Sequence, residues 1–550
     1  MAQISYRGNL SAAVFPMSLA QAGRSVIVPG PDNNYDRRVD PEGEQKDAGI
    51  PQAIYLENVI PTANGYQSVG SITKFPITGI GADETNVILK VDSPIVTTAG
   101  GQRIGLYLAF VNNGTVLCNY TDLSSTWQLA TSSGPDPWPP AGVNPSKKAD
   151  VSIATIRGVT YVVSNSTWYE VQITGGTPVV NLLDVTASVV GITAGHSLHI
   201  CSSYNYLIVL DRTDNAVYWS STTTPLSFTP SLVTGAGTAV PNAMNTKPLF
   251  LIESPKGFFI YCVGGIVSAM YTGNSRYPWK FTPVADAGSY SIAENVAASP
   301  TSGEHFSIDD SNKIYVISHE AAQIIAPEAT DWLCRIKTTD RYNQATDTFS
   351  TVQFASSSVK FSRIHDVMER YIAVSYSITH PDFGGYEGCV IYDRVFKRYG
   401  VIKYAHNYIL SEDDNLYFVK SINSDDTQVR EILFDIYAKD YYASAEFSAV
   451  LALGKFQYVR SQLLQLNEVE IESVQSADLI TPQDFDLKIL PSLDGKNFNS
   501  AVTPTVDATR TAGTLVSYKT RNTAKNFTLV LKGAFDVSSI GLNFHIAGRR

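Results

Sequence analysis

The sequence has few charged residues, few cysteines and no long apolar run, and each shortage excludes a class of protein. Charged residues make up 17% of the 550 positions and hydrophobic residues 44%, whereas a disordered chain is more charged and less aromatic. No apolar run approaches the ~18 residues that a membrane-spanning helix requires. The composition is therefore that of a globular protein with enough chain for a large core or several domains.

Basic residues are outnumbered and scattered. The formal net charge is −10 at pH 7, and adjacent basic residues form only pairs, such as those at positions 37–38, 147–148 and 549–550. Tight binding of nucleic acid requires clustered cations that neutralise phosphates. We therefore expect no sequence-specific nucleic-acid binding, although an acidic protein suits the wall of a channel through which DNA slides.

The five cysteines stand far apart and form no CxxC motif: Cys118, Cys201, Cys262, Cys334 and Cys389. An odd count without paired spacing argues against a disulfide framework and for a reducing compartment. Residues 10–23 have some features of a secretory signal. However, Arg7 is the one cation before them and Pro16 interrupts their apolar core, so we interpret them as part of the working chain.

A repeated turn organises the chain. The stretch VLDRTDNAVYW at residues 209–219 places Asp and Asn between two β-prone runs, which is the pattern of a β-hairpin. Similar clusters centre on positions 113, 165, 214, 264 and 311, with gaps of 52, 49, 50 and 47 residues, and again on 414. A weaker copy near His365 divides the last, longer gap. An all-β period of about 50 residues predicts propeller blades, about six or seven of them over residues 86–440.

The Asp and Asn cluster at residues 211–215 has two interpretations. Asp211, Asp214 and Asn215 offer oxygen ligands for a metal, but the same residue types also build turns, because their side chains bond nearby backbone. The copy at Gly264 and Gly265 has no side-chain ligand, and the calcium-loop order D-x-[DN]-x-[DN]-G is absent. We therefore predict turns, with no metal and no cofactor.

The regions on either side of the repeat differ from it. Residues 1–85 are rich in loop-forming residues and predict an extended N-terminal arm. After residue 440 the period is lost, and β-prone runs predict a C-terminal β-sandwich-like unit over residues 441–550. Inside the propeller, the proline-rich segment 132–148 around Trp138 predicts a stiff surface loop, with a docking loop as the alternative. A short helix is expected near residues 320–332.

Motifs for catalysis occur only as fragments. His319 starts an HExxH-like stretch in which Gln323 replaces the second histidine. His196 and His199 form an HxxH in a β-prone stretch, where the alternation of a strand places them on opposite faces.

Two further fragments suggest glycosidase chemistry. Asp309 and Asp310 are adjacent carboxylates on a turn, where neighbouring side chains rarely converge on one substrate. The Thr-Trp pairs at 126–127 and 167–168 lack the Asp and Gly of a sialidase Asp-box. We therefore predict no catalytic residues and a protein that is not an enzyme.

Five stretches carry a likeness to a known family: LENVIPTANGYQSVGS (residues 56–71), GGIVSAMYTGNSRYPWKFTPVADAGSYS (264–291), SGEHFSIDDSNKIYVI (302–317), CVIYDRVFKRYGVIK (389–403) and the ending GLNFHIAGRR (541–550). The chain resembles the tail nozzle or tail-hub proteins of short-tailed bacteriophages, also called head–tail stabilisation proteins. The resemblance lies in patterns of fold spread over most of the chain rather than in signature motifs.

The resemblance implies a structural virion protein with no catalytic set. Such proteins form a ring, usually of six copies, on the tail below the portal and adaptor. The ring encloses the channel for double-stranded DNA, supports genome retention and ejection, and carries fibres or spikes. Assembly would take place in the host cytoplasm, without membrane insertion. The alternative is a carbohydrate-binding or glycosidase-like propeller that recognises a host receptor; an acidic and aromatic pocket on the propeller axis would favour it.

Overall fold

The computed structural model of the chain consists of β-strands joined by turns and a few short 3-10 helices. Among the residues described, no helix has the length and hydropathy to cross a membrane. The structure describes residues 3–9, 26–27, 53–63, 65–69, 72–77, 88–98, 100–120, 127–140, 143–146, 148–174, 179–291, 293–299, 303–311, 313–325, 338–353, 360–367, 370–377, 388–396, 398–404, 406, 408–412, 415–420, 429–435, 449–457, 462–473, 485–493, 499–510 and 514–549.

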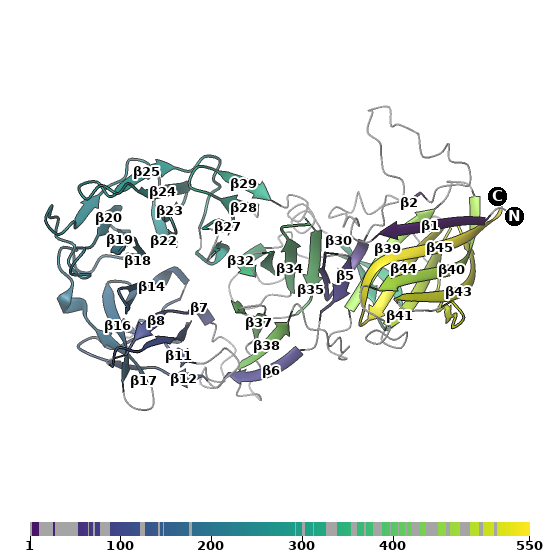
Figure 1. Cartoon of the computed structure of the whole chain (residues 1–550), viewed down its shortest axis with the longest axis horizontal. Coiled ribbons are helices and arrows are strands. Elements are labelled where there is room, and N and C mark those ends of the chain that lie inside the picture. The colour runs from purple at the N-terminus through teal and green to yellow at the C-terminus, as the bar shows by residue number, and fades with distance from the viewer. Residues whose placement is uncertain are drawn as a thin grey trace.

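Seven sheets arranged as a ring confirm the predicted β-propeller (Figure 1). Blade 1 contains β7 (Ile88–Asp92), β10 (Tyr107–Val111), β11 (Val116–Asn119) and β12 (Gln128–Leu129). Blade 2 contains β14 (Val151–Ile156), β15 (Val159–Ser164), β16 (Thr167–Thr174) and β17 (Val179–Asp184), with β13 (Thr131–Ser133) parallel to β17. Blade 3 contains β18 (Leu198–Ser203), β19 (Tyr206–Asp211), β20 (Ala216–Trp219) and β21 (Gly237–Ala239).

The remaining blades follow the same order. Blade 4 contains β22 (Pro248–Ser254), β23 (Gly257–Cys262), β24 (Gly265–Tyr271) and β25 (Trp279–Pro283). Blade 5 contains β26 (Val296–Ala298), β27 (His305–Ile308), β28 (Ile314–Ile317) and β29 (Ala322–Ile325). Blade 6 contains β32 (Lys360–Val367), β33 (Tyr371–Ser377), β34 (Gly388–Asp393) and β35 (Arg398–Ile402). Blade 7 contains β36 (Tyr408–Glu412), β37 (Asn415–Lys420), β38 (Val429–Asp435) and β6 (Ile72–Ile77).

The first strand of each blade lies nearest the axis. Strand β14 contacts β18, β18 contacts β22, β22 contacts β26, β26 contacts β32, β32 contacts β36, and β36 contacts β7. Two hairpins are added to this plan, β8 (Ile95–Thr97) with β9 (Arg103–Gly105) and β30 (Thr338–Asn343) with β31 (Thr348–Gln353). Strand β6 precedes blade 1 in sequence but pairs with β38, so it completes the last blade and closes the ring.

The C-terminal unit is built from two packed sheets that are antiparallel except for the pairing of β2 with β39, in agreement with the sandwich-like prediction. One contains β39 (Ala449–Gln457), β44 (Asn526–Gly533) and β41 (Phe485–Ser492), joined by β2 (Val26–Ile27) and β3 (Ala53–Glu57). The other contains β40 (Gln462–Ser473), β43 (Leu515–Ala524), β42 (Thr505–Val506), β45 (Asp536–Arg549) and β1 (Gln3–Asn9). Phe527 and Phe544, one from each sheet, meet with their ring centroids 5.6 Å apart.

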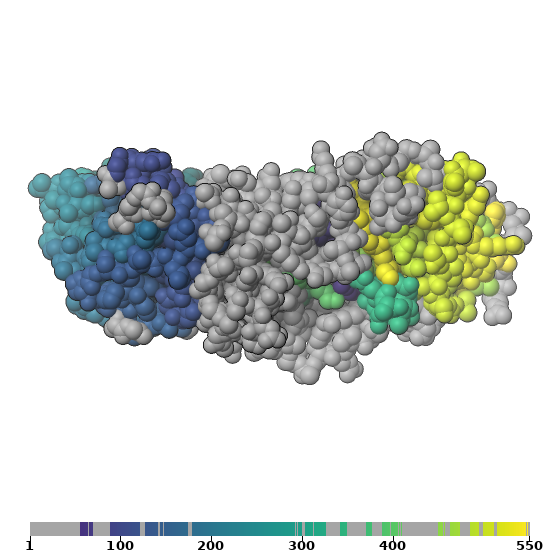
Figure 2. Space-filling view, turned by 90° about the horizontal axis from the view of Figure 1, so that it is seen from below, coloured from purple at the N-terminus to yellow at the C-terminus, as the bar shows by residue number. Residues whose placement is uncertain are grey.

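The propeller and the C-terminal unit share one sheet. Strand β35 of blade 6 pairs with β4 (Val59–Pro61), β4 pairs with β5 (Tyr66–Ser68), and β5 pairs with β45. We call β35, β4, β5 and β45 the seam; Figure 1 shows it joining the propeller to the C-terminal unit, and Figure 2 shows that the whole body is elongated. One apolar core runs through it, from Phe306 in blade 5 through Val401 to Leu529 and Phe544 in the C-terminal unit. The two parts are therefore packed as one body.

The expected N-terminal arm differs from the structure wherever residues 1–85 are described. Strand β1 pairs with β45, β3 with β39, and β6 with β38, so these segments lie in sheets of both units. The physical reason is that short apolar runs such as AIYLE and ITKFPI pair with strands far along the chain, which local composition does not reveal. The loop-rich stretch 28–49 and the signal-like stretch 10–23 lie outside the described residues.

Two local expectations also change. The helix expected near 320–332 is replaced, as far as it is described, by strand β29, whose residues pair with β28. The repeat copy placed near His365 lies inside β32, where His365 pairs with Ala373. Strands β32 and β33 are the first and second strands of their blade, whereas the turns at 113, 165, 214, 264 and 311 join second and third strands. Position 414 lies outside the described residues, between β36 and β37, which are also the first and second strands of a blade.

Trp138 anchors the proline-rich segment to the propeller. Its ring packs edge-to-face against Phe110 of blade 1 and Tyr169 of blade 2, with centroids 5.3 and 5.4 Å apart. Its Nε1–H donates to the carbonyl of Gly114 at 2.9 Å. The tryptophan therefore fills the gap between two blades, in keeping with a stiff loop, and its ring is not presented for docking.

The described cysteines are free thiols inside the blades: Cys118, Cys201, Cys262 and Cys389. Burial raises the pKa of the Cys118 thiol to about 11 and that of Cys262 to about 12. Cys334 lies outside the described residues.

Candidate functional site at the propeller axis

Asp211 shows how the repeated turn works. Its side chain is fully buried, and its Oδ1 accepts the backbone N–H groups of Thr213 at 2.9 Å and Asp214 at 3.1 Å. Asn215 completes the reversal with a left-handed φ of 54°, a conformation that asparagine tolerates. The contacts of Asp211 therefore agree with the turn interpretation.

Asp309 and Asp393 use the same device. Each carboxylate accepts two backbone N–H groups of its own turn at 2.8 to 3.1 Å. The second oxygen accepts a side-chain donor, the Tyr315 hydroxyl at 3.2 Å for Asp309 and Arg370 Nη2 at 2.8 Å for Asp393. Asp310, in contrast, is exposed and accepts the Ser291 hydroxyl at 2.7 Å, so the adjacent pair Asp309 and Asp310 forms no shared carboxylate site.

His196 adds a partner to the Asp211 turn. Its Nδ1 lies 2.7 Å from Asp211 Oδ2 and 3.6 Å from Asp214 Oδ2. The hydrogen bond with Asp211 raises the pKa of His196. These three side chains could surround a small cation, since their ligand atoms all lie within 4.8 Å of one another. Because Asp211 already serves the turn and His196, the same contacts are explained without an ion.

The other histidine fragments do not assemble into a site. His199 is buried, and its Nδ1 accepts the backbone N–H of Leu251 at 3.3 Å; burial lowers its pKa well below the usual value. His319 is held by the hydroxyls of Ser268 at 2.6 Å and Ser254 at 2.9 Å. Gln323 lies on strand β29 rather than on a helix, and Trp127 and Trp168 are buried in the propeller.

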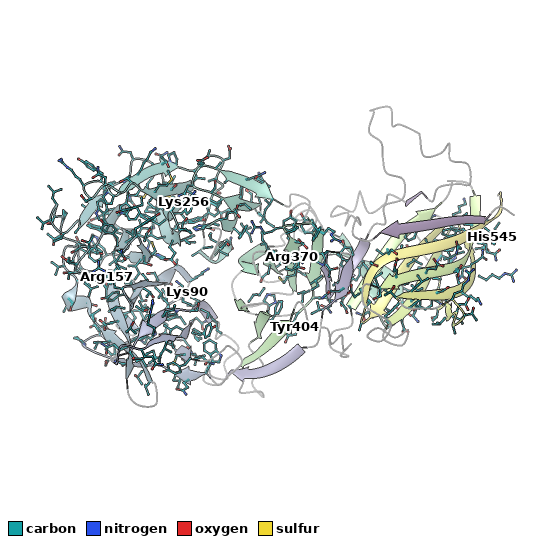
Figure 3. All side chains as sticks on the ribbon, in the orientation of Figure 1. Lys90, Arg157, Lys256, Arg370, Tyr404 and His545 are labelled. Atoms are coloured by element: carbon teal, nitrogen blue, oxygen red, sulfur yellow. The ribbon has the colours of Figure 1, made fainter. Side chains whose placement is uncertain are left out.

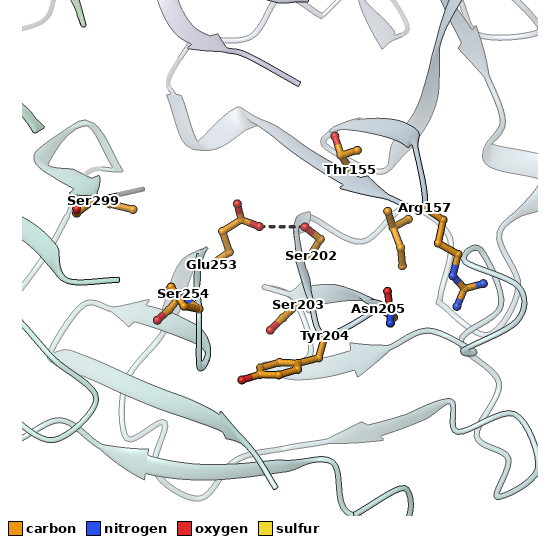
Figure 4. A pocket seen from close by; sticks show the side chains of 12 residues that line it. Thr155, Arg157, Ser202, Ser203, Tyr204, Asn205, Glu253, Ser254 and Ser299 are labelled. Atoms are coloured by element: carbon orange, nitrogen blue, oxygen red, sulfur yellow. Dashed lines mark hydrogen bonds between the residues drawn. The ribbon is translucent and has the colours of Figure 1, made fainter. Parts of the chain in front are cut away.

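A pocket opens where the inner strands of four blades end. Its walls are the turns at 155–157, 202–205 and 253–255 and residues 298–299, which belong to blades 2, 3, 4 and 5, and its volume is about 420 Å³. We call it the Glu253 pocket; Figure 4 shows Glu253, Ser202, Tyr204 and Asn205 around its opening. Because each wall comes from a different blade, the pocket lies on the propeller axis.

Glu253 provides the carboxylate of this pocket. Its Oε2 accepts the Ser202 hydroxyl at 2.9 Å (Figure 4). Removal from water raises the pKa of Glu253; the Ser202 hydrogen bond opposes the shift, the Asp92 carboxylate adds to it and Lys90 opposes it. Lys90 (Figure 3) and Asp92 lie on β7 of blade 1, and Lys90 Nζ is 3.0 Å from Asp92 Oδ2. The axis therefore carries charges of both signs.

Tyr204 forms one edge of the pocket in an unusual conformation. Tyr204 and Asn205 have φ values of 47° and 63°, so both lie in the left-handed region, which a bulky aromatic residue rarely adopts. The Tyr204 ring is 45% exposed and stacks on Tyr271, with centroids 4.3 Å apart and planes 18° apart. The turn therefore holds an aromatic face at the mouth of the axis.

A second pocket of about 410 Å³ lies at the opposite ends of the same inner strands. Its Arg212 guanidinium donates to the carbonyls of Ala149, Leu198 and Leu249, which lie at the starts of blades 2, 3 and 4, at 3.2 to 3.4 Å. Arg212 therefore joins three blades where carbonyl groups converge, and its role in this pocket is structural.

Comparisons with known proteins assign neither a family nor a function to the chain. No family model and no curated protein matches the chain. A solved structure of BBS1N in complex with ARL6DN is 8% identical and covers 67% of this chain and 97% of its own, with a TM-score of 0.36. The Cps50 (Swd1) β-propeller domain of Myceliophteria thermophila is 8% identical over 64% and 99%, with a TM-score of 0.33. AztD from Citrobacter koseri is 10% identical over 66% and 94%, with a TM-score of 0.33. Likenesses this low carry no argument about function.

Sequence reasoning did not identify the axial pocket, because its walls come from turns between first and second strands, whereas the repeat pattern marked the turns at the other end. The one local signal is the Tyr204-Asn205 pair, which occupies a tight turn between two β-prone runs where glycine or asparagine is usual.

Proposed function

We propose that the chain is a structural subunit of a short phage tail, a nozzle or hub protein that forms a ring around the DNA channel below the portal and adaptor. The likeness of the five quoted segments suggests this role. The observation that supports it most is the seam, because a continuous sheet and a continuous core connect the propeller to the C-terminal unit.

The seam matters because domains within one chain usually move relative to each other unless a large apolar interface joins them. Two side chains reinforce it. Arg398 donates to the carbonyls of Thr62, Ala63 and Gly65 in the turn between β4 and β5. Lys403 Nζ lies 3.2 Å from Glu57 Oε1. A subunit reinforced in this way suits a ring that must keep its shape while pressurised DNA passes through it.

The acidic balance of the chain fits the same role. With a net charge of −10, six copies would form a ring that repels phosphate, so that DNA slides rather than binds. In this proposal the subunit contacts neighbouring copies of itself, the adaptor and portal, and the fibres or spikes.

Ring formation tests the proposal directly. Negative-stain electron microscopy of the purified chain, alone and mixed with the portal–adaptor complex of its own virus, should show closed rings that seat on that complex. A monomer that never joins the complex would contradict the proposal.

A DNA-binding assay provides the second arm. Binding of a duplex fragment should be weak at about 50 mM salt and absent at about 200 mM, because few phosphates are neutralised. Tight binding at physiological salt would contradict a sliding channel even if rings form.

A further inference from the structure

Two polar groups that line the Glu253 pocket are not used by the described part of the chain. Glu253 Oε1 and the Asn205 side chain make no hydrogen bond with the described part of the chain, whereas Glu253 Oε2 holds Ser202. The hydroxyls of Ser203 and Ser254 are already engaged, with the Gly257 carbonyl at 3.0 Å and His319 Nε2 at 2.9 Å. The engaged groups fix the turns, and the remaining ones point to a ligand.

The balance of charge in this pocket limits the chemistry of that ligand. Its walls contain one carboxylate, Glu253, and one guanidinium, Arg157. Arg157 Nη2 donates to the Thr222 carbonyl. This hydrogen bond holds the guanidinium at one side of the pocket. Glu253 would repel an anion, and Arg157 and Lys90 would repel a cation. An apolar ligand would leave the Asn205 amide and the Glu253 carboxylate without hydrogen-bond partners, which costs free energy. A neutral ligand with many hydroxyl groups satisfies all of them.

Tyr204 gives the ligand a flat face to pack on. An aromatic residue in the left-handed conformation of a tight turn has a strained backbone. The same conformation costs less free energy for Asn, Asp or Gly. The stack on Tyr271 fixes the ring plane. Strain of this kind is characteristic of binding sites, where a side chain is held in a position that the backbone alone does not favour.

We propose that the Glu253 pocket binds a neutral sugar unit, whose ring packs on Tyr204 and whose hydroxyl groups bond to Glu253 and Asn205. The volume of about 420 Å³ lies within the ~300–1,000 Å³ typical of small-molecule sites. Sugar rings have an apolar C–H face for an aromatic platform and hydroxyls that both donate and accept. The inference concerns binding and does not rest on the proposed ring.

Saturation-transfer NMR with defined probes tests the proposal. Maltose, cellobiose, lactose and chitobiose represent free sugar units, and dextran represents units within a polymer. At least one probe should receive saturation at its ring protons. Transfer to a disaccharide indicates a terminal or free unit, and transfer to dextran alone indicates an internal one. Absence of transfer to every probe would overturn the proposal.

Two variants separate binding from folding. Tyr204→Asn keeps a residue suited to the left-handed turn and removes the ring, so the protein should fold normally and bind its probe about tenfold more weakly. Glu253→Gln keeps the shape and removes the charge-assisted hydrogen bond, with a similar loss of about tenfold.

Matched controls complete the test. Tyr277 is 63% exposed on blade 4 outside the pocket, so Tyr277→Ala should leave binding unchanged. Binding that survives both pocket variants, or that falls equally in Tyr277→Ala, would show that the sugar binds elsewhere and would overturn the proposal.

Discussion

Blades 2 to 5 and the seam are assembled in opposite ways. In the blades, the first to fourth strands pair in sequence order, as in β18, β19, β20 and β21, and the added strand β13 of blade 2 is an exception. In the seam, residues 59–68 lie between residues 398–402 and residues 536–537. The blades therefore need only short loops to form their hydrogen bonds, whereas the seam orders long stretches of chain at a higher cost in conformational entropy.

The two regions also use charge differently. The blade turns bury carboxylates such as Asp211 and Asp309, whose negative charge is satisfied by backbone N–H groups of the same turn. The seam buries a cation, Arg398, which is satisfied by carbonyls more than 300 residues away in sequence. Damage to a turn should therefore remain local, and damage to the seam should affect both units.

The largest effect is expected from Gly65→Ala in the seam. A Cβ at this position would lie 1.9 Å from the Val537 carbonyl oxygen, and neither backbone can withdraw without breaking the pairing of β5 with β45. The substitution should lower the free energy of unfolding by about 3 kcal/mol or more, as measured by denaturant titration.

Gly105→Ala is the matched control, because a Cβ there would meet nothing within 4 Å. It should change stability by less than about 0.5 kcal/mol. Equal effects of the two substitutions would remove the contrast between the seam and the exposed hairpin.

A pH-dependent effect is expected from Asp536, also in the seam. Burial raises its pKa from 3.8 to about 6, and its Oδ1 has no hydrogen-bond partner within the described structure. The unfolded chain releases this proton near pH 4 and the folded chain near pH 6, so the wild type loses stability as pH rises between them.

Asp536→Asn should therefore raise stability by about 2 kcal/mol above pH 6, since a tenfold change in an acid's dissociation constant corresponds to ~1.4 kcal/mol and the amide recovers only part of the total. Thermal unfolding at pH 4 and pH 7.5 checks this. A gain that is the same at both pH values would indicate that the ionisation of Asp536 is not its cause.

Within the blades, Asp211→Ala should cost about 2 kcal/mol, because two turn N–H groups lose their buried acceptor. Asp214→Asn is the comparison, because Asp214 is exposed and no turn N–H depends on its side chain; it should cost less than about 0.5 kcal/mol.

Addition of a chelator should leave the melting temperature of the wild type unchanged. A drop of several degrees would instead identify His196, Asp211 and Asp214 as a metal site.

Among the substitutions that we expect to destabilise the chain, Trp138→Phe should have the smallest effect. The substitution keeps an aromatic ring between Phe110 and Tyr169 but removes the hydrogen bond from Nε1 to the Gly114 carbonyl. A loss of about 1 kcal/mol is expected from one buried hydrogen bond, again by denaturant titration. A loss of about 3 kcal/mol, the size expected for a serious packing defect, would mean that this gap between blades is as critical as the seam.

The blades could be predicted from sequence because their signal is local. Turn clusters such as residues 211–215 recur at the blade period, since every second-to-third hairpin in blades 1 to 5 must reverse within a few residues. Spacing alone did not show that the cluster at 414 belongs to a different hairpin of its blade. Strand β6 could not be assigned, because its partner β38 lies more than 350 residues away and nothing in ITKFPI specifies that partner.

The axial pocket was missed for a related reason. Glu253, Ser202 and Asn205 have no motif in common, and only the ring of blades brings their turns together. Sequence fragments such as the HExxH-like stretch at His319 carry no such spatial information: in the structure, His319 bonds to Ser254 and Ser268.

The pairing of β1 with β45 and of β6 with β38 determines the order in which a newly made chain can finish folding. Strand β1 is synthesised more than 500 residues before its partner β45. At roughly 5–20 residues per second, the interval is on the order of tens of seconds. Blades 2 to 5 can form during that time, while β1 and β6 wait for their partners, and β45 then completes the C-terminal unit.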